Sequence, residues 1–169
     1  MALSLNPAPA PAALRAIADA NATWPSRSKI SDGILGDAAH LARCTKEGRC
    51  EGHVLGNAVD ITHDPANGVD GRTLAELALN DNRTAYVISN GQIKSRKGPF
   101  AGQDWRAYSG NPHTKHVHVS LDPNMRNEAG PWPWAPSIVP VRNSTMTIVA
   151  MTGGITALAY YLGRLIFKW

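Results

Sequence analysis

Alternating apolar and polar positions predict a set of short strands. In "NAVDITHD", residues 57–64, Val59 and Ile61 fall on one side of an extended chain and Asp60 on the other. "AYVISN" (85–90) and "HVHVSL" (116–121) alternate in the same way, and the Asn-Gly pair after the first of these predicts a hairpin turn into "QIKSR" (92–96). Such short strands joined by a hairpin favour an antiparallel sheet.

Helical periodicity predicts the remaining regular elements. We expect a first helix over residues 12–22 and the opening of a second in "GDAAHLAR", with Asp37 near its N-terminus. A third helix, "DGRTLAELALND", places Leu74, Leu77 and Ala78 on one stripe. Residues 44–53 and 98–114 are predicted as loops. The fold class is therefore α+β, with a small antiparallel sheet, helices packed on one side, and a C-terminal hydrophobic helix.

The pattern divides the chain into three parts. Residues 1–123 form the predicted domain, and residues 124–143 are predicted as a linker because "EAGPWPWAPSIVPV" is rich in proline and tryptophan. Residues 144–169 contain "MTIVAMTGGITALAYYLG", which carries no charge and has basic residues on both sides. We expect this last segment to span a membrane, and the alternative is a hydrophobic helix docked on the domain.

Composition narrows the classes of partner. The 169 residues are 43% hydrophobic and 18% charged, as in ordinary globular proteins. The net charge of +4 suits an anionic partner such as a bacterial envelope, but no run of basic residues interleaved with aromatics predicts nucleic-acid binding. The two cysteines, Cys44 and Cys50, either close a small disulfide loop or stay as thiols, and their spacing excludes a C-x-x-C zinc site.

Histidine placement raises the question of chemistry. The stretch "NPHTKHVHV" holds three of the six histidines, and His116 and His118 share one face of the predicted strand. His53 lies seven positions before Asp60, and Gly52 and Gly56 permit a tight turn between them. If His53, Asp60 and His118 converge, two nitrogens and one oxygen surround a cation, a set that suits catalytic zinc with water as the fourth ligand.

The elements "HVLGNAVD" and "HTKHVH" together resemble the LAS group of zinc peptidases, named for lysostaphin-type enzymes, D-Ala-D-Ala metallopeptidases and the hedgehog signalling domain. The resemblance implies that the zinc ligands are His53, Asp60 and His118. It also implies that His116 is catalytic, and His113 matches the murein-endopeptidase-like branch. Many relatives carry a glutamate as general base where this chain has Lys115, so a histidine must serve, and either His113 or His116 is open for that role.

The resemblance covers residues 24–122 and extends to phage endolysin peptidase domains. It implies a zinc-dependent endopeptidase that cuts bacterial peptidoglycan in phage lysis or from the virion, located at the host inner membrane, in the periplasm or on the particle. The alternatives are a D-Ala-D-Ala carboxypeptidase and a non-catalytic, zinc-containing wall-binding module. A lesion made in the membrane by residues 144–169 is a third possibility.

Weaker candidates surround these residues. Arg27 could bind a substrate carboxylate or carbonyl, as an upstream arginine does in the relatives, or it could be solvated. His63 and Asp64 are either partners of the metal ligands or turn caps. Trp105 and Tyr108 either line a peptide groove or belong to the core, and the pair Asp37 and His40 is expected to be structural.

Overall fold

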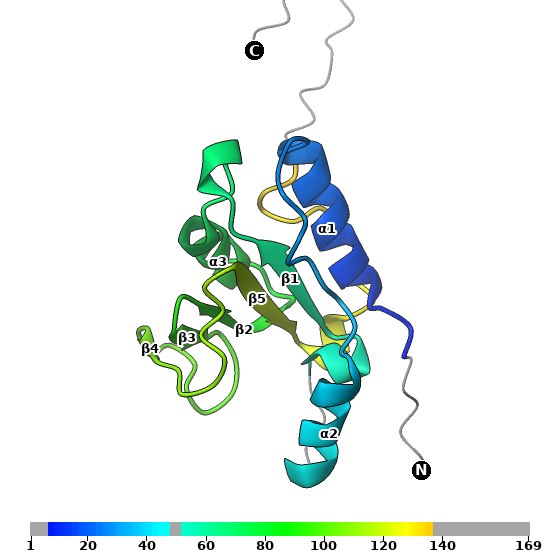
Figure 1. The fold of residues 1–169 in the computed structure, drawn as a ribbon, viewed down its shortest axis with the longest axis vertical. Coiled ribbons are helices and arrows are strands. Elements are labelled where there is room, and N and C mark those ends of the chain that lie inside the picture. The colour runs from blue at the N-terminus through cyan, green and yellow to red at the C-terminus, as the bar shows by residue number, and fades with distance from the viewer. Residues whose placement is uncertain (1–6, 48–51, 137–169) are drawn as a thin grey trace, which may run out of the picture. The chain divides into compact units, whose positions relative to one another are not determined.

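The computed structural model describes residues 7–47 and 52–136 (Figure 1). Its helices and strands run in the order α1 (Pro11–Thr23), α2 (Ala38–Glu47), β1 (Ala58–Thr62), α3 (Gly71–Leu79), β2 (Thr84–Ser89), β3 (Gln92–Ser95), β4 (Arg106–Ala107) and β5 (His116–Leu121). Short 3-10 helices lie at Gly52–Leu55 (η1), Pro65–Asn67 (η2) and Pro123–Met125 (η3). The α+β class and each of the predicted helices and strands of the domain are confirmed. The loop predictions missed β4, η1 and the last turn of α2.

Local signals set the ends of these elements. Pro11 occupies the first turn of α1, where its missing N–H costs no hydrogen bond. The Asp70 carboxylate caps α3 by accepting from the Thr73 backbone N–H at 2.8 Å. Asn90 and Gly91 both have positive φ angles, of 47° and 74°, as a tight hairpin turn between β2 and β3 requires.

The sheet has the strand order β1-β5-β2-β3-β4, and all neighbours are antiparallel. The last strand of the chain therefore inserts between β1 and β2 (Figure 1). This pairing places Asp60 directly opposite His118, and Thr62 opposite His116. Residues from two distant parts of the sequence consequently meet on one face of the sheet.

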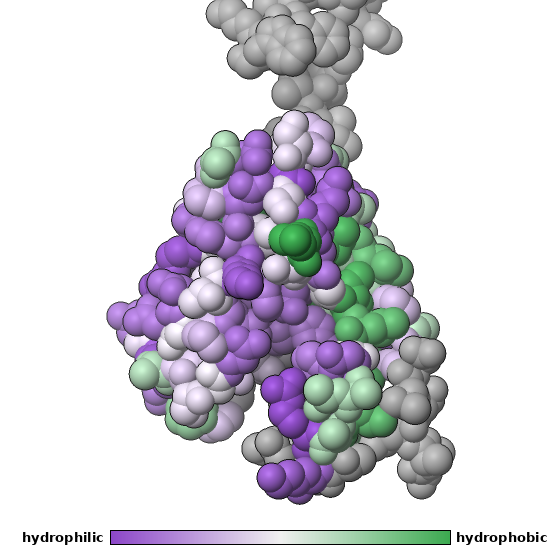
Figure 2. Space-filling model, in the orientation of Figure 1, coloured by the Kyte–Doolittle hydropathy of each residue, from purple (hydrophilic) through white to green (hydrophobic). Residues whose placement is uncertain are grey.

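The other face of the same strands builds the hydrophobic core. Val59, Ile61, Val117 and Val119 are fully buried, and they cluster with apolar side chains of α1 and α3. The fully buried α1 residues of this cluster are alanines, whose small side chains let the helix approach the sheet closely, and the partly buried Ile17 packs against them. In Figure 2 most of the visible surface is hydrophilic, and hydrophobic residues gather on the side of α1.

The predicted packing of helices on one side holds for α1 and α3 but not for α2. Residues of α2 line a pocket with Asp60, His116 and His118, which belong to the polar face of the sheet. The predicted position of Asp37 at the start of this helix is confirmed, and its carboxylate accepts from the His40 backbone N–H at 3.0 Å. The reason is compositional: α2 has few apolar side chains to bury and contacts η1 rather than the core.

The predicted linker begins inside the folded domain. Trp132 and Trp134 are 2% and 3% exposed and stack on each other at 4.7 Å. Their indole N–H groups donate to the carbonyls of Ala12 and Ala16 in α1. Prolines exclude a helix here, but an extended segment can still dock two large apolar rings. The domain thus extends through residue 136, beyond the predicted boundary at residue 123.

Several predictions fall wholly or partly outside the described residues. These concern residues 137–143 of the linker, the hydrophobic helix over 144–169, and Cys50. Cys44 itself is buried and disulfide-bonded. Within residues 7–47 and 52–136, no helix combines the length and apolar character that crossing a membrane demands.

Candidate metal centre

The η1 turn delivers His53 to the polar face of the sheet. Gly52 and Gly56 flank it with positive φ angles of 59° and 67°, so the chain reverses between His53 and β1 as the sequence predicted. At Gly56 a side chain would also collide with the backbone, because a Cβ there would lie 2.7 Å from the Ala8 carbonyl oxygen. The glycine at this position is therefore needed for both conformation and space.

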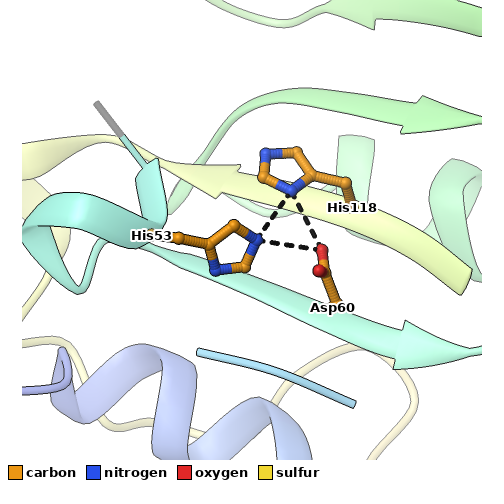
Figure 3. A group of neighbouring side chains, drawn as sticks. All are labelled: His53, Asp60 and His118. Atoms are coloured by element: carbon orange, nitrogen blue, oxygen red, sulfur yellow. Dashed lines mark hydrogen bonds and ion pairs between the residues drawn. The ribbon is translucent and has the colours of Figure 1, made fainter. Parts of the chain in front are cut away.

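His53, Asp60 and His118 converge at this turn (Figure 3). The His53 Nε2 lies 3.1 Å from Asp60 Oδ1 and 3.1 Å from His118 Nδ1. The third side of the triangle, between His118 Nδ1 and Asp60 Oδ1, is 3.0 Å. The two histidines are 7% and 6% exposed. The structure thus brings together the three residues predicted as metal ligands.

The two ring nitrogens of His53 have different partners. Its Nδ1 lies 2.8 Å from the Ile34 carbonyl oxygen, which can only accept, so Nδ1 carries the proton of the neutral ring. In the neutral ring Nε2 then has a lone pair toward the Asp60 carboxylate, so these two atoms attract each other only when Nε2 carries a proton or a metal ion. A backbone carbonyl on the far nitrogen is also the usual way to orient a metal-binding histidine.

The charges of the triad influence one another. Burial alone would raise the pKa of Asp60, but hydrogen bonds from His118 and His53 hold it well below its usual range. Burial lowers the pKa of His118 despite the nearby carboxylate. For His53 burial acts in the same direction, but the hydrogen bond and charge of Asp60 outweigh it and raise the pKa. Asp60 is therefore ionised, and a proton or metal ion shared with His53 and His118 would balance its negative charge.

The dimensions of the triangle fit a divalent ion. Tetrahedral zinc with ligand bonds of about 2.0–2.1 Å separates its ligand atoms by about 3.3 Å. The three observed separations, 3.0, 3.1 and 3.1 Å, are close to that value. Two neutral imidazoles and one carboxylate form a donor set suited to zinc and neighbouring transition metals. The buried group can therefore hold a metal ion.

Two further histidines stand beside the triad. His116 Nε2 lies 3.3 Å from Asp60 Oδ2, and the His113 ring packs edge-on against His116 at 4.9 Å between centroids. His113 has a φ of 50°, an uncommon conformation for a residue other than glycine. Burial, together with the charges of His118 and His116, lowers the pKa of His113 to about 4. His113 is thus neutral near pH 7.

A pocket of about 420 Å³ opens over these residues. One wall comes from α2, with His40 and Arg43, and another from the segment after β4, with Tyr108, Asn111 and His113. Figure 2 shows the surface hollowed between α2 and the loops around β3 and β4. The Tyr86 ring stacks on His118 and completes the floor.

Arg27, predicted to bind substrate, does not reach this pocket. Its side chain is fully buried and forms a salt bridge with Asp32. The guanidinium also donates to Asn21 and to the Ser28 carbonyl. The arginine that does line the pocket is Arg43, which the sequence did not single out. The only sequence signal was its position one turn after His40 on the same helix.

Some of the weaker candidates line the pocket and others do not. Tyr108 lines the pocket, whereas the Trp105 indole donates to Glu76 on α3. His63 and Asp64 hydrogen-bond to backbone N–H groups: His63 Nδ1 accepts from Gly71, and Asp64 accepts from Ser28, which lies 36 positions earlier. His40 bonds to Asp37 within α2 and also lines the pocket, so the purely structural interpretation of this pair is incomplete.

Comparison with known proteins gives no match, whether with family models, with curated proteins or with solved structures. The resemblance to LAS-type peptidases therefore rests on the motif residues alone. The geometry of the metal centre and its pocket is accordingly the basis for assigning a function to this chain.

Proposed function

We propose that the protein is a zinc-dependent peptidase that hydrolyses a peptide bond of bacterial peptidoglycan. The observation that carries the proposal is the triangle of His53, Asp60 and His118 on the floor of an open pocket, with His116 and His113 beside it. A structural metal site would be closed by a fourth protein ligand, whereas a catalytic site keeps a position open toward substrate. The pocket above the triad supplies that opening.

Zinc bound by the triad would lower the pKa of a water molecule and polarise the scissile carbonyl. The His53 ring is held ready for this by the Ile34 carbonyl, and Asp60 supplies the negative charge that balances the cation. Burial of His53 and His118 excludes competing water from the metal side and strengthens every charge interaction there.

We assign the proton transfers to His116. Its Nε2 lies 3.3 Å from Oδ2 of Asp60, the carboxylate that would hold the metal, and is therefore near the position of an attacking water. From there His116 could take a proton from the water and return it to the leaving amine. His113 is less suited to act as the base, because a pKa of about 4 makes it a poor proton acceptor at neutral pH. Its Nδ1 donates to the Asn111 carbonyl, so Nε2 remains to accept a hydrogen bond from a substrate N–H.

The substrate side of the pocket is cationic. Arg43 projects from α2 into the lining, and the chain as a whole carries a net charge of +4. Stem peptides of the wall carry carboxylates, which a guanidinium binds in a bidentate manner. The proposed place of action, at the host inner membrane, in the periplasm or on a virion, follows from this substrate and from the hydrophobic segment over 144–169.

Arg43 also favours a second candidate within the same chemistry. A single guanidinium beside the metal could hold the C-terminal carboxylate of an uncross-linked stem peptide. The protein would then be a D-Ala-D-Ala carboxypeptidase rather than an endopeptidase. Both candidates use the same triad and differ in the bond that is placed over it.

The test is digestion of purified sacculi by the full chain, followed by mass spectrometry of the released and residual fragments. The endopeptidase predicts loss of cross-linked dimers, and the carboxypeptidase predicts loss of terminal D-Ala alone. A chelator should stop either reaction and added zinc should restore it. His116→Ala should keep its zinc and its wall binding but lose digestion. If wild-type protein binds the wall and releases nothing, the non-catalytic binding module is correct instead.

A further inference from the structure

Asp60 presents its two carboxylate oxygens to two different sets of histidines. Oδ1 faces His53 and His118, at 3.1 and 3.0 Å. Oδ2 faces His116, at 3.3 Å from Nε2. The carboxylate thus lies between two groups of nitrogen donors, and only one of these groups is used by the metal site described above.

The second group has the composition of a metal site of its own. Asp60, His113 and His116 each offer one ligand atom, and these atoms all lie within 4.8 Å of one another. His113 is oriented in the same way as His53: its Nδ1 donates to a backbone carbonyl, that of Asn111, and leaves Nε2 with a lone pair. A backbone bond of this kind fixes the tautomer that a cation needs.

His116 has a matching feature on its other side. Its Nε2 faces the carboxylate, and its Nδ1 is buried with no hydrogen-bond partner among the described residues. No described group therefore fixes a proton on Nδ1, and on the other side the Asp60 carboxylate can accept a hydrogen bond from Nε2–H. A cation at Nε2 would settle this by leaving the proton on Nδ1.

We propose that Asp60 bridges two cation sites, and that Asp60, His113 and His116 form a second, weaker divalent-metal site beside the His53–Asp60–His118 centre. Carboxylates that bridge two metal ions hold them about 3.5–4 Å apart in known two-metal sites. We expect the second site to be the weaker because all three of its residues are less buried than His53 and His118, so water competes more strongly for the ion there.

Occupation of this site would have a consequence for activity, which rests on the proposed function. The second ion takes the lone pair of His116 that the peptidase needs for proton transfer. Zinc beyond one equivalent should therefore slow wall digestion, while the first equivalent supports it. The second site would therefore be inhibitory, and its occupation would depend on the concentration of free zinc.

The experiment measures binding and does not depend on peptidase activity. Metal-free full-length protein is titrated with zinc chloride by equilibrium dialysis, and the bound metal is counted per chain. We expect two ions, the second with a dissociation constant at least about tenfold higher than the first. His113→Ala should bind one ion with the tight constant unchanged, and His63→Ala, which removes a histidine outside both groups, should still bind two.

Saturation of the wild-type protein at one ion would overturn the proposal, and so would two ions in His113→Ala. The wild-type count needs no variant to fold, and circular dichroism checks that the His113→Ala protein does. The two proposals also fail separately. One bound ion with full wall digestion refutes the second site alone, whereas two bound ions in the zinc titration, with no digestion at one equivalent of zinc, refute the peptidase alone.

Discussion

Two of the buried charged clusters among the described residues lie close to each other, and they differ in how far the protein itself balances their charge. In the first, the Arg27 guanidinium pairs with Asp32, at 2.8 Å between Nη1 and Oδ1, and Asp32 also accepts from the backbone and hydroxyl of Thr62. The two charges balance each other, and of the guanidinium nitrogens only Nε has no hydrogen-bond partner among the described residues. In the second, the Asp60 carboxylate faces imidazole nitrogens, and His53 Nε2 attracts it only when that nitrogen carries a proton or a metal ion.

The difference separates a structural cluster from a binding site. A buried charge is tolerated when the chain itself supplies the opposite charge and the hydrogen bonds, as it does for Asp32. The negative charge of Asp60, by contrast, is balanced only if the triad takes up a proton or a metal ion. A cluster that is complete by itself holds the fold, whereas a cluster that lacks a cation is arranged to bind one.

The complete cluster also supports the incomplete one. Arg27 and Asp32 anchor the segment that continues through Gly33, whose backbone pairs with Asp60. The next residue, Ile34, provides the carbonyl that orients His53. The Arg27–Asp32 pair therefore holds the backbone segment on which the geometry of the metal centre depends.

The largest expected effect follows from Asp60→Asn. The amide keeps the shape of the side chain but loses the negative charge that holds the cation, so zinc binding and wall digestion should both collapse. We expect the digestion rate to fall by about a thousandfold or more. The measurements are zinc content after dialysis and the rate of dye release from labelled sacculi.

The control for this variant is Asp104→Asn, which changes the same chemical group on a side chain that is 90% exposed. It should leave zinc content and digestion unchanged. If Asp60→Asn digested the wall at more than a tenth of the wild-type rate, the triad would not be the reacting centre, and the contrast between the two clusters would lose its meaning.

A smaller effect, on stability, is expected for Arg27→Ala. Removing the guanidinium leaves the Asp32 carboxylate poorly compensated, and loss of one partner of a buried pair costs about 3 kcal/mol of unfolding free energy. Chemical denaturation of the metal-free protein measures this loss. Lys94→Ala, which breaks an ion pair with the exposed Asp104, should leave the free energy of unfolding unchanged, because water screens that pair.

The Arg27–Asp32 pair should also affect how the free energy of unfolding falls at acid pH. Burial would raise the pKa of Asp32, but the hydrogen bonds from Arg27 and Thr62 lower it below the value of the unfolded chain. The stabilisation is therefore present above the unfolded pKa of about 3.9 and is lost as pH falls through the folded pKa. Arg27→Ala should consequently lose less stability than wild type as the pH is lowered past 4. Equal acid slopes would show that the pair is not formed in solution.

The sequence predicted the incomplete cluster and misassigned the complete one. Strict alternation in β1 and β5 places Asp60 and His118 on the polar face whatever the packing, because side chains alternate along any strand. The pairing of Asp60 with His118 also requires β5 to insert beside β1, which the local pattern does not encode. The resemblance of the two motifs supplied what periodicity could not.

Arg27 shows the limit of local patterns. Burial of an arginine depends on Asp32, Asn21 and the path of the loop between them, and a sequence pattern cannot tell this from a solvated cation. Trp132 and Trp134 were misplaced for a similar reason, since the prolines around them signal an irregular backbone but not its docking on α1. Contacts between distant segments decide both cases.

The smallest expected effect concerns Arg43, the cation that belongs to neither cluster. It lines the pocket from α2, and its role in the proposed reaction is to hold an anionic group of the substrate. Arg43→Ala should raise KM for a soluble cross-linked muropeptide about fivefold, or about 1 kcal/mol, and leave kcat, zinc content and stability unchanged. Steady-state kinetics on the full chain measure the split between the two constants.

Lys46→Ala is the matched control, because it removes the same charge from the same helix at a position that does not line the pocket. If both variants raise KM equally, the effect is one of net charge and salt should abolish it. If Arg43→Ala alone raises KM, the guanidinium makes a specific contact, and Arg43→Lys should recover only part of it because an ammonium lacks the planar fork. A fall in kcat with KM unchanged would instead place Arg43 at the reacting atoms. Arg43 would then act in the reaction together with the metal site and His116, and would not be a separate anchor for the substrate.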